Sequence, residues 1–156
     1  MNPALIQQIE SALAGQNFSE ALKSANRLIS EFPGDAAGYV LLGDVFAGME
    51  NWAKALENYQ KAIDISADDA HIYFKIGEMY ELRDDYRSAR ENIQITMRLE
   101  PDNKHYSGRL GVLVYEEGLE KKNVNLQQEG YQLMEQSLHG NSDMMVRDAL
   151  ANACIN

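Results

Sequence analysis

The chain has 156 residues, of which 45% are hydrophobic, and this is enough for one domain with a buried core. Its 24 Asp and Glu residues outnumber its 14 Lys and Arg residues, so the formal net charge is -10 and the sequence pI is near 4.7. This charge repels nucleic-acid phosphates and anionic lipid headgroups, so we expect neither as a partner.

Cysteine usage and hydropathy exclude further classes. The only cysteine is Cys154, so neither an intrachain disulfide nor a multi-cysteine metal site is expected. Apolar runs such as 39–42 are far shorter than the roughly 20 residues of a membrane-spanning helix. Residues 1–15 contain no Lys or Arg and therefore do not resemble a secretory signal. We expect a cytoplasmic protein without membrane insertion.

Residues 2–35 are predicted to form two helices joined by a turn. Asn17 and Glu20 have the spacing of a capping box at the start of the second helix. Pro33 and the glycine that follows it mark the end of this helical hairpin.

Residues 36–69 are predicted to form a second hairpin, with Asp35 just ahead of its first helix. Apolar residues recur in it at helical spacing. They are Tyr39, Leu42 and Phe46, then Trp52, Leu56, Tyr59 and Ile63.

Residues 70–103 repeat the pattern, because a shift of 34 positions aligns this unit with those before it. The aligned columns are Gly43, Gly77 and Gly111; Ala21, Ala55 and Ala89; Phe18, Trp52 and Tyr86; Asn17, Asn51 and Asp85; and Asp35, Asp69 and Asn103. The glycine and alanine columns predict that the two helices of each hairpin approach closely.

The fourth unit departs from the period after Gly111. Its alanine position falls on Asn123, and the next small residue suited to that role is Gly130, seven positions later. Two extra helical turns would explain the offset. We therefore predict a long helix from about His105 to Glu120 and a partner helix from about Val124 to Leu138.

The last segment, from Asp143 to Ala153, has Met144, Met145 and Leu150 among polar residues and is predicted to form a closing helix that shields the last apolar face. The whole chain is then one domain of four hairpins and a cap, over residues 1–156, with divisions at 2–35, 36–69, 70–103, 104–140 and 141–156.

A 34-residue period with an aromatic, a glycine, a second aromatic, an alanine and a terminal proline resembles the tetratricopeptide repeat (TPR) family. The second unit matches best, with Tyr39, Leu42, Gly43, Phe46, Ala55, Tyr59 and Ala62. Ala67 replaces the terminal proline there, and Ile9 replaces the glycine in the first unit. The resemblance implies an all-α, right-handed α-solenoid of stacked hairpins. It also implies a protein-interaction module rather than an enzyme.

Members of the family bind peptides in a concave groove formed by the first helix of each hairpin. The groove positions in this sequence are Glu10, Val40, Asp44, Phe74, Lys75, Glu78, Glu81, Arg109 and Tyr115. Glu10, Asp44 and Glu78 form one column and would make a ladder of negative charge, while Val40, Phe74 and Tyr115 would be apolar anchors. These residues predict a partner with a basic or amphipathic segment.

One subgroup of the family holds a C-terminal carboxylate in a clamp of Lys, Asn and Arg. The corresponding positions here are Val40, Asp44, Lys75, His105 and Arg109. Only Lys75 and Arg109 match in charge, so an acidic C-terminal tail is not the expected ligand.

The three histidines, His71, His105 and His139, are also 34 residues apart. Successive hairpins lie about a helix diameter apart, whereas Zn–N bonds are about 2.0–2.1 Å, so no metal is expected. Cys154 has no recognisable acid–base partner, and no phosphate-binding loop is present. We expect no catalytic residue and no cofactor. Two alternatives remain: a self-assembling scaffold whose terminal helix docks on another copy, and the regulatory TPR region of a larger enzyme.

Overall fold

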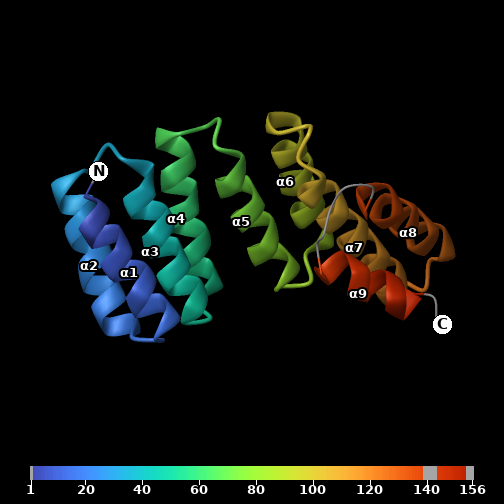
Figure 1. Cartoon of the computed structure of the whole chain (residues 1–156), viewed down its shortest axis with the longest axis horizontal. Helices are drawn as coiled ribbons and strands as arrows, with labels where there is room; N and C mark the ends of the chain where they lie inside the picture. Colours follow the sequence, from blue (N-terminus) through green and yellow to red (C-terminus); the bar gives the residue numbers. More distant parts are fainter. Residues whose placement is uncertain (1, 139–143, 154–156) are drawn as a thin grey trace. The chain divides into compact units, whose positions relative to one another are not determined.

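The computed structural model describes residues 2–138 and 144–153, which form nine α-helices and no strand (Figure 1). The helices are α1 (Pro3–Ala14), α2 (Phe18–Glu31), α3 (Ala36–Gly48), α4 (Trp52–Ile65), α5 (Ala70–Glu81), α6 (Tyr86–Leu99), α7 (Lys104–Glu120), α8 (Val124–Leu138) and α9 (Met144–Ala153). The chain divides into two compact units, with the boundary between Lys75 and Ile76, inside α5.

The predicted capping residues do cap the helices. The side chains of Asn17, Asn51 and Asp85 accept hydrogen bonds of 3.1–3.3 Å from the backbone N–H three residues later. The capping box at Asn17 is used only in part, because the carboxylate of Glu20 accepts a 2.7 Å hydrogen bond from Gln8 Nε2 on α1. The periodic polar residues therefore fix where the helices begin.

The turn inside each hairpin also repeats, and it corrects the expected insertion. Gln16, Glu50, Asp84 and Lys122 have φ between 51° and 58°, the left-handed region. The first three are 34 residues apart, but Lys122 follows Asp84 by 38. The connection between the two helices of the fourth hairpin is therefore displaced by four residues, which is about one helical turn. An insertion of two helical turns was expected. The rest of the seven-residue offset of Gly130 lies within α8. Asn123 caps the start of this helix.

The core of the first unit lies between α1, α2 and α3, which pack against one another. Its buried residues are Leu5, Ile9, Ala12, Ala21, Ala25, Leu28, Leu42 and Val45. In the α3/α4 hairpin, Gly43 lies against the ring of Tyr59, where a Cβ atom would overlap the ring. The predicted close approach is confirmed at this glycine.

The second unit contains a still closer helix pair, α7 and α8. A Cβ atom on Gly111 would lie 2.7 Å from the backbone nitrogen of Met134, and one on Gly130 would lie 2.5 Å from the backbone nitrogen of Tyr115. The prediction that Gly130 takes the role of the missing alanine is confirmed. The predicted bounds of these two helices also agree with the structure within one residue.

Helix α9 covers an apolar face of this hairpin. Val146 and Leu150 pack with Val112 of α7 and Met134 of α8. Leu150 is only 9% exposed, so its side chain is taken up inside the second unit. The side chains of Met144 and Met145, on which the self-assembly hypothesis also depended, lie outside the described residues.

Candidate functional site

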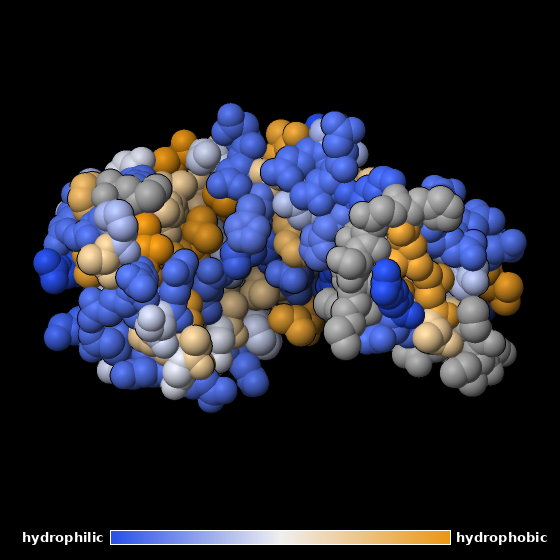
Figure 2. Space-filling model, in the orientation of Figure 1, coloured by the Kyte–Doolittle hydropathy of each residue, from blue (hydrophilic) through white to orange (hydrophobic). Residues whose placement is uncertain are grey.

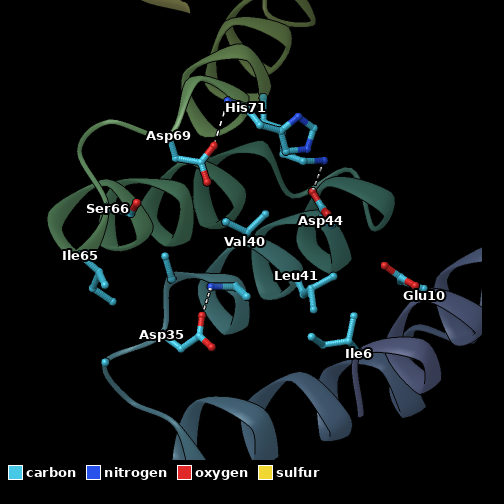
Figure 3. Close-up of a pocket in the computed structure, with 14 residues that line it drawn as sticks. Ile6, Glu10, Asp35, Val40, Leu41, Asp44, Ile65, Ser66, Asp69 and His71 are labelled. Atoms are coloured by element: carbon cyan, nitrogen blue, oxygen red, sulfur yellow. Dashed lines mark hydrogen bonds and ion pairs between the residues drawn. The ribbon is translucent and has the colours of Figure 1, made fainter. Parts of the chain in front are cut away.

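The first unit carries an open hollow of about 770 Å³, shown in Figure 3. It is bordered by α1, α3, the end of α4 and the start of α5. Four of the predicted groove residues line it together: Glu10, Val40, Asp44 and Lys75. The other lining residues are Ile6, Gly34, Asp35, Ala36, Ala37, Leu41, Ile65, Ser66, Asp69 and His71.

The hollow has an apolar surface. Ile6 and Leu41 lie side by side in Figure 3, and both also pack against the core of the first unit. Val40 is partly buried, and Ile65, at the end of α4, is 41% exposed. On the face shown in Figure 2, hydrophobic residues are visible between α1 and α3, with hydrophilic residues around them. A bound segment would find apolar surface and a polar rim.

Asp44 joins three helices at the rim of the hollow. Its Oδ1 atom accepts a 2.7 Å hydrogen bond from the hydroxyl of Tyr59 on α4 and lies 2.8 Å from Nζ of Lys75 on α5. The side chains of Lys75 and Asp44 are only 20% and 22% exposed. Their charges are therefore partly shielded from water and largely committed to each other.

The hollow has an excess of negative charge. Among the described residues, it is lined by one ammonium group, that of Lys75, and by four carboxylates, those of Glu10, Asp35, Asp44 and Asp69. Asp35 and Asp69 each accept a 3.0 Å hydrogen bond from a backbone N–H in the first turn of α3 and α5. Glu10 is exposed and makes no hydrogen bond or ion pair within the part of the chain that the structure describes.

Three more predicted residues, Glu78, Glu81 and Arg109, line a second hollow of about 580 Å³ on the second unit. Arg109 Nη2 lies 2.9 Å from Glu81 Oε2, and the Arg109 side chain is 7% exposed. Burial raises the pKa of Glu81, although Arg109 acts in the opposite direction. Burial also raises the pKa of Glu116, which lines the same hollow.

Two of the predicted groove residues are placed elsewhere. Phe74 is 8% exposed, so the expectation that it is an apolar anchor of the groove is wrong. The aromatic ring is large and apolar, so its burial stabilises the fold more than an exposed position would. Tyr115 packs against the cluster that contains Met134 and Leu150, and it lines neither of the two hollows above.

Ile6 and Ile65 are among the lining residues that were not predicted from the sequence. Ile6 lies one helical turn before Glu10 and so shares its face, which is a signal that helical spacing provides. Ile65 is at the end of a second helix, whereas the groove positions were predicted on first helices alone.

The histidines do not form a common site in the described parts of the chain. His71 lines the first hollow, and His105 belongs to the second unit, where its ring packs edge-on against Tyr106. His139 and Cys154 lie outside the described residues. Over residues 2–138 and 144–153, no group of three His, Cys, Asp or Glu side chains is placed to hold a metal ion.

Comparison with known proteins agrees with this geometry. Residues 43–82 match the family described as TPR repeat. PilF of Pseudomonas aeruginosa is 20% identical with a TM-score of 0.81, over 98% of this chain and 67% of that one. A thermophilic TPR protein of Thermus thermophilus is 18% identical with a TM-score of 0.77, over 98% and 81%. MamA is 19% identical with a TM-score of 0.67, over 85% and 77%. No curated protein matches the sequence.

The repeat match and the fold together define the class of structure: residues 43–82 match the TPR repeat, and the chain has the fold of helical hairpins seen in a solved TPR protein. The all-α fold of helical hairpins expected from the sequence is confirmed. Proteins built from this repeat are in general protein–protein interaction modules and non-catalytic scaffolds. Among the described helices, none has the length and apolar character needed to cross a membrane.

Proposed function

We propose that the chain is an adaptor that binds an amphipathic segment of another protein, carrying basic side chains, in the hollow of its first unit. The observation that carries this proposal is the combination of apolar surface and unbalanced carboxylates in one open hollow. Ile6, Val40 and Leu41 offer contact area to an apolar side chain of the partner, while Glu10 offers it an unpaired negative charge.

The two kinds of contact have different roles. Burial of an apolar side chain supplies binding free energy at about 25 cal/mol per Å² of surface removed from water. Complementary charge mainly sets orientation and association rate, and salt screens it when the charges are exposed. We therefore expect binding whose affinity falls, without vanishing, as ionic strength rises.

The charges elsewhere in the chain support the same kind of partner. Among the described residues, the second hollow is lined by one guanidinium group, that of Arg109, and by four carboxylates, those of Glu78, Glu81, Asp84 and Glu116. The two residues that match the carboxylate clamp in charge, Lys75 and Arg109, are each paired with a carboxylate of this chain. Neither is well placed to receive an acidic tail.

We keep the cytoplasmic location as a prediction.

A peptide of defined chemistry can test the proposal in place of the natural partner. The probe is a fluorescein-labelled peptide of alternating Leu and Lys, compared with the same peptide carrying Glu in place of Lys, and binding is measured by fluorescence anisotropy at low and high salt. Glu10→Lys reverses a charge in the hollow. Asp64→Lys makes the same charge change on the exposed surface of α4, outside the hollow, and is the matched control.

We expect the Lys peptide to bind the wild-type protein and the Asp64→Lys variant alike, and to bind Glu10→Lys roughly tenfold more weakly at low salt. The Glu peptide should bind none of them measurably. Equal binding of the Lys peptide to both variants, with both folded by circular dichroism, would remove the first hollow as the site.

A further inference from the structure

We infer that Lys75 sets the partner specificity of the first hollow by occupying Asp44, so that the hollow selects a segment with one basic side chain placed for Glu10. The inference rests on the proposed function and names the feature that selects the partner. It assigns opposite roles to two acidic residues that the sequence placed in one equivalent column.

Asp44 already has two partners within the protein. One oxygen, Oδ1, receives both the Tyr59 hydroxyl at 2.7 Å and the Lys75 ammonium at 2.8 Å. Both charged side chains are about four-fifths buried. An ammonium group of a partner would have to displace Lys75 from Oδ1, which separates a partly desolvated ion pair, or approach Oδ2 of a carboxylate whose charge Lys75 already neutralises. Asp44 is therefore a weak acceptor for a partner's cation as long as Lys75 is paired with it.

The other three carboxylates of the hollow differ in their surroundings. Asp35 and Asp69 cap the N-termini of α3 and α5, where the helix dipole places partial positive charge that opposes a bound cation. Glu10 is in the second half of α1, closer to the negative end of its helix, and it is exposed. Glu10 is thus the carboxylate of the hollow at which a partner's cation gains most.

The hollow is unfavourable for an anionic partner. Lys75 carries the only ammonium group among the described residues that line the hollow, and its charge is already neutralised by Asp44. A carboxylate on a partner would have to separate this pair while lying among the remaining acids of the rim. The Lys75–Asp44 pair therefore rejects an acidic segment and, because it neutralises the charge of Asp44, limits the number of cations that the hollow attracts.

The test uses the Leu/Lys peptide and neutral variants of Lys75. Lys75→Met keeps the aliphatic side chain but releases Asp44, and Lys75→Gln is a second neutral variant with different packing. Lys75→Arg keeps the positive charge and is the matched control. We expect Lys75→Met and Lys75→Gln to bind the peptide roughly fivefold to tenfold more tightly than wild type, and Lys75→Arg to remain within about twofold.

A double-mutant cycle with Glu10→Gln separates this role from a change in net charge alone. In the wild-type background, Glu10→Gln should weaken binding roughly fivefold. In the Lys75→Met background its effect should be clearly smaller, because the released Asp44 offers a second acceptor. A merely structural role for Lys75 would leave the effect of Glu10→Gln unchanged.

The outcomes distinguish the two levels of the proposal. If the peptide binds the wild-type protein and Glu10→Gln weakens it, but neither neutral Lys75 variant binds more tightly, then the role of Lys75 is overturned and the proposed function stands. If the peptide binds neither the wild-type protein nor any variant, while circular dichroism shows helical proteins, both the proposed function and this inference are overturned.

Discussion

Replacing Gly130 with alanine tests whether backbone contact sets the distance between α7 and α8. The new Cβ atom would lie 2.5 Å from the backbone nitrogen of Tyr115 and 2.6 Å from the carbonyl oxygen of Gly111. Ordinary contact begins at 3.4 Å, so the helices would have to separate by roughly 0.9 Å at this point. Both neighbouring atoms belong to the backbone, and no side-chain rotation can relieve the contact.

Two opposing effects decide the magnitude. Alanine in place of glycine stabilises a helix interior by about 1 kcal/mol. Overpacking of a close contact costs about 1–3 kcal/mol, and we take the upper end because rigid backbone is involved. The expected net loss is therefore about 2 kcal/mol. At Gly77 the nearest atom to an added Cβ is a side-chain carbon of Ile93 at 3.1 Å, so Gly77→Ala should be neutral or slightly stabilising.

The assay is urea unfolding followed by far-ultraviolet circular dichroism, with Gly77→Ala as the matched control on the second unit. A lower unfolding midpoint for Gly130→Ala, together with an unchanged or higher midpoint for Gly77→Ala, agrees with the argument. Wild-type stability or better for Gly130→Ala would refute it, because the gain in helix propensity would then exceed the cost of the contact.

Two further changes test the turn and the buried ion pairs. Lys122 has a φ of 51°, so Lys122→Gly should raise the free energy of unfolding by roughly 0.5–1 kcal/mol, whereas Lys122→Ala should give no such gain in the same urea titration. Glu117 accepts hydrogen bonds from Arg90 at 3.2 Å and Lys121 at 2.6 Å. Burial acts to raise the pKa of Glu117, but the two positively charged partners together outweigh burial, so the pKa is lowered. Glu117→Gln should therefore cost roughly 1.5 kcal/mol at neutral pH, and the difference from wild type should shrink as the pH falls below 4.5, the ordinary value; a pH-independent difference would contradict this assignment.

Much of the fold follows from the sequence because the repeat encodes its own boundaries. Capping residues such as Asn51 and Asp85 recur at the period, and each one satisfies a backbone N–H that the first helical turn cannot pair. Gly43 could be predicted for a similar reason, since only a side chain of hydrogen leaves room for the Tyr59 ring. The insertion in the fourth unit was harder to place, because Gly111 and Gly130 fix the total offset but not the position of the turn.

The candidate site was less predictable because residues in one column of the repeat differ in their surroundings. Glu10 and Asp44 are equivalent by period, yet only Asp44 meets an ammonium group and a hydroxyl within the described part of the chain. Phe74 follows the same period as Val40, but it is buried while Val40 lines the hollow. The spacing of residues identifies which face of a helix they share. Ion pairing and burial depend on the neighbouring helix, and the spacing within one helix carries no information about that neighbour.

Titration of the Leu/Lys peptide into ¹⁵N-labelled protein, followed by the backbone amide resonances, shows which surface binds the peptide. If the first hollow is the binding surface, we expect shift changes concentrated on α1, α3 and the start of α5, around Glu10, Val40 and Lys75. We also expect that the changes around Glu10 are lost in Glu10→Lys. Changes confined to other helices, or changes that Glu10→Lys leaves intact, would contradict this prediction.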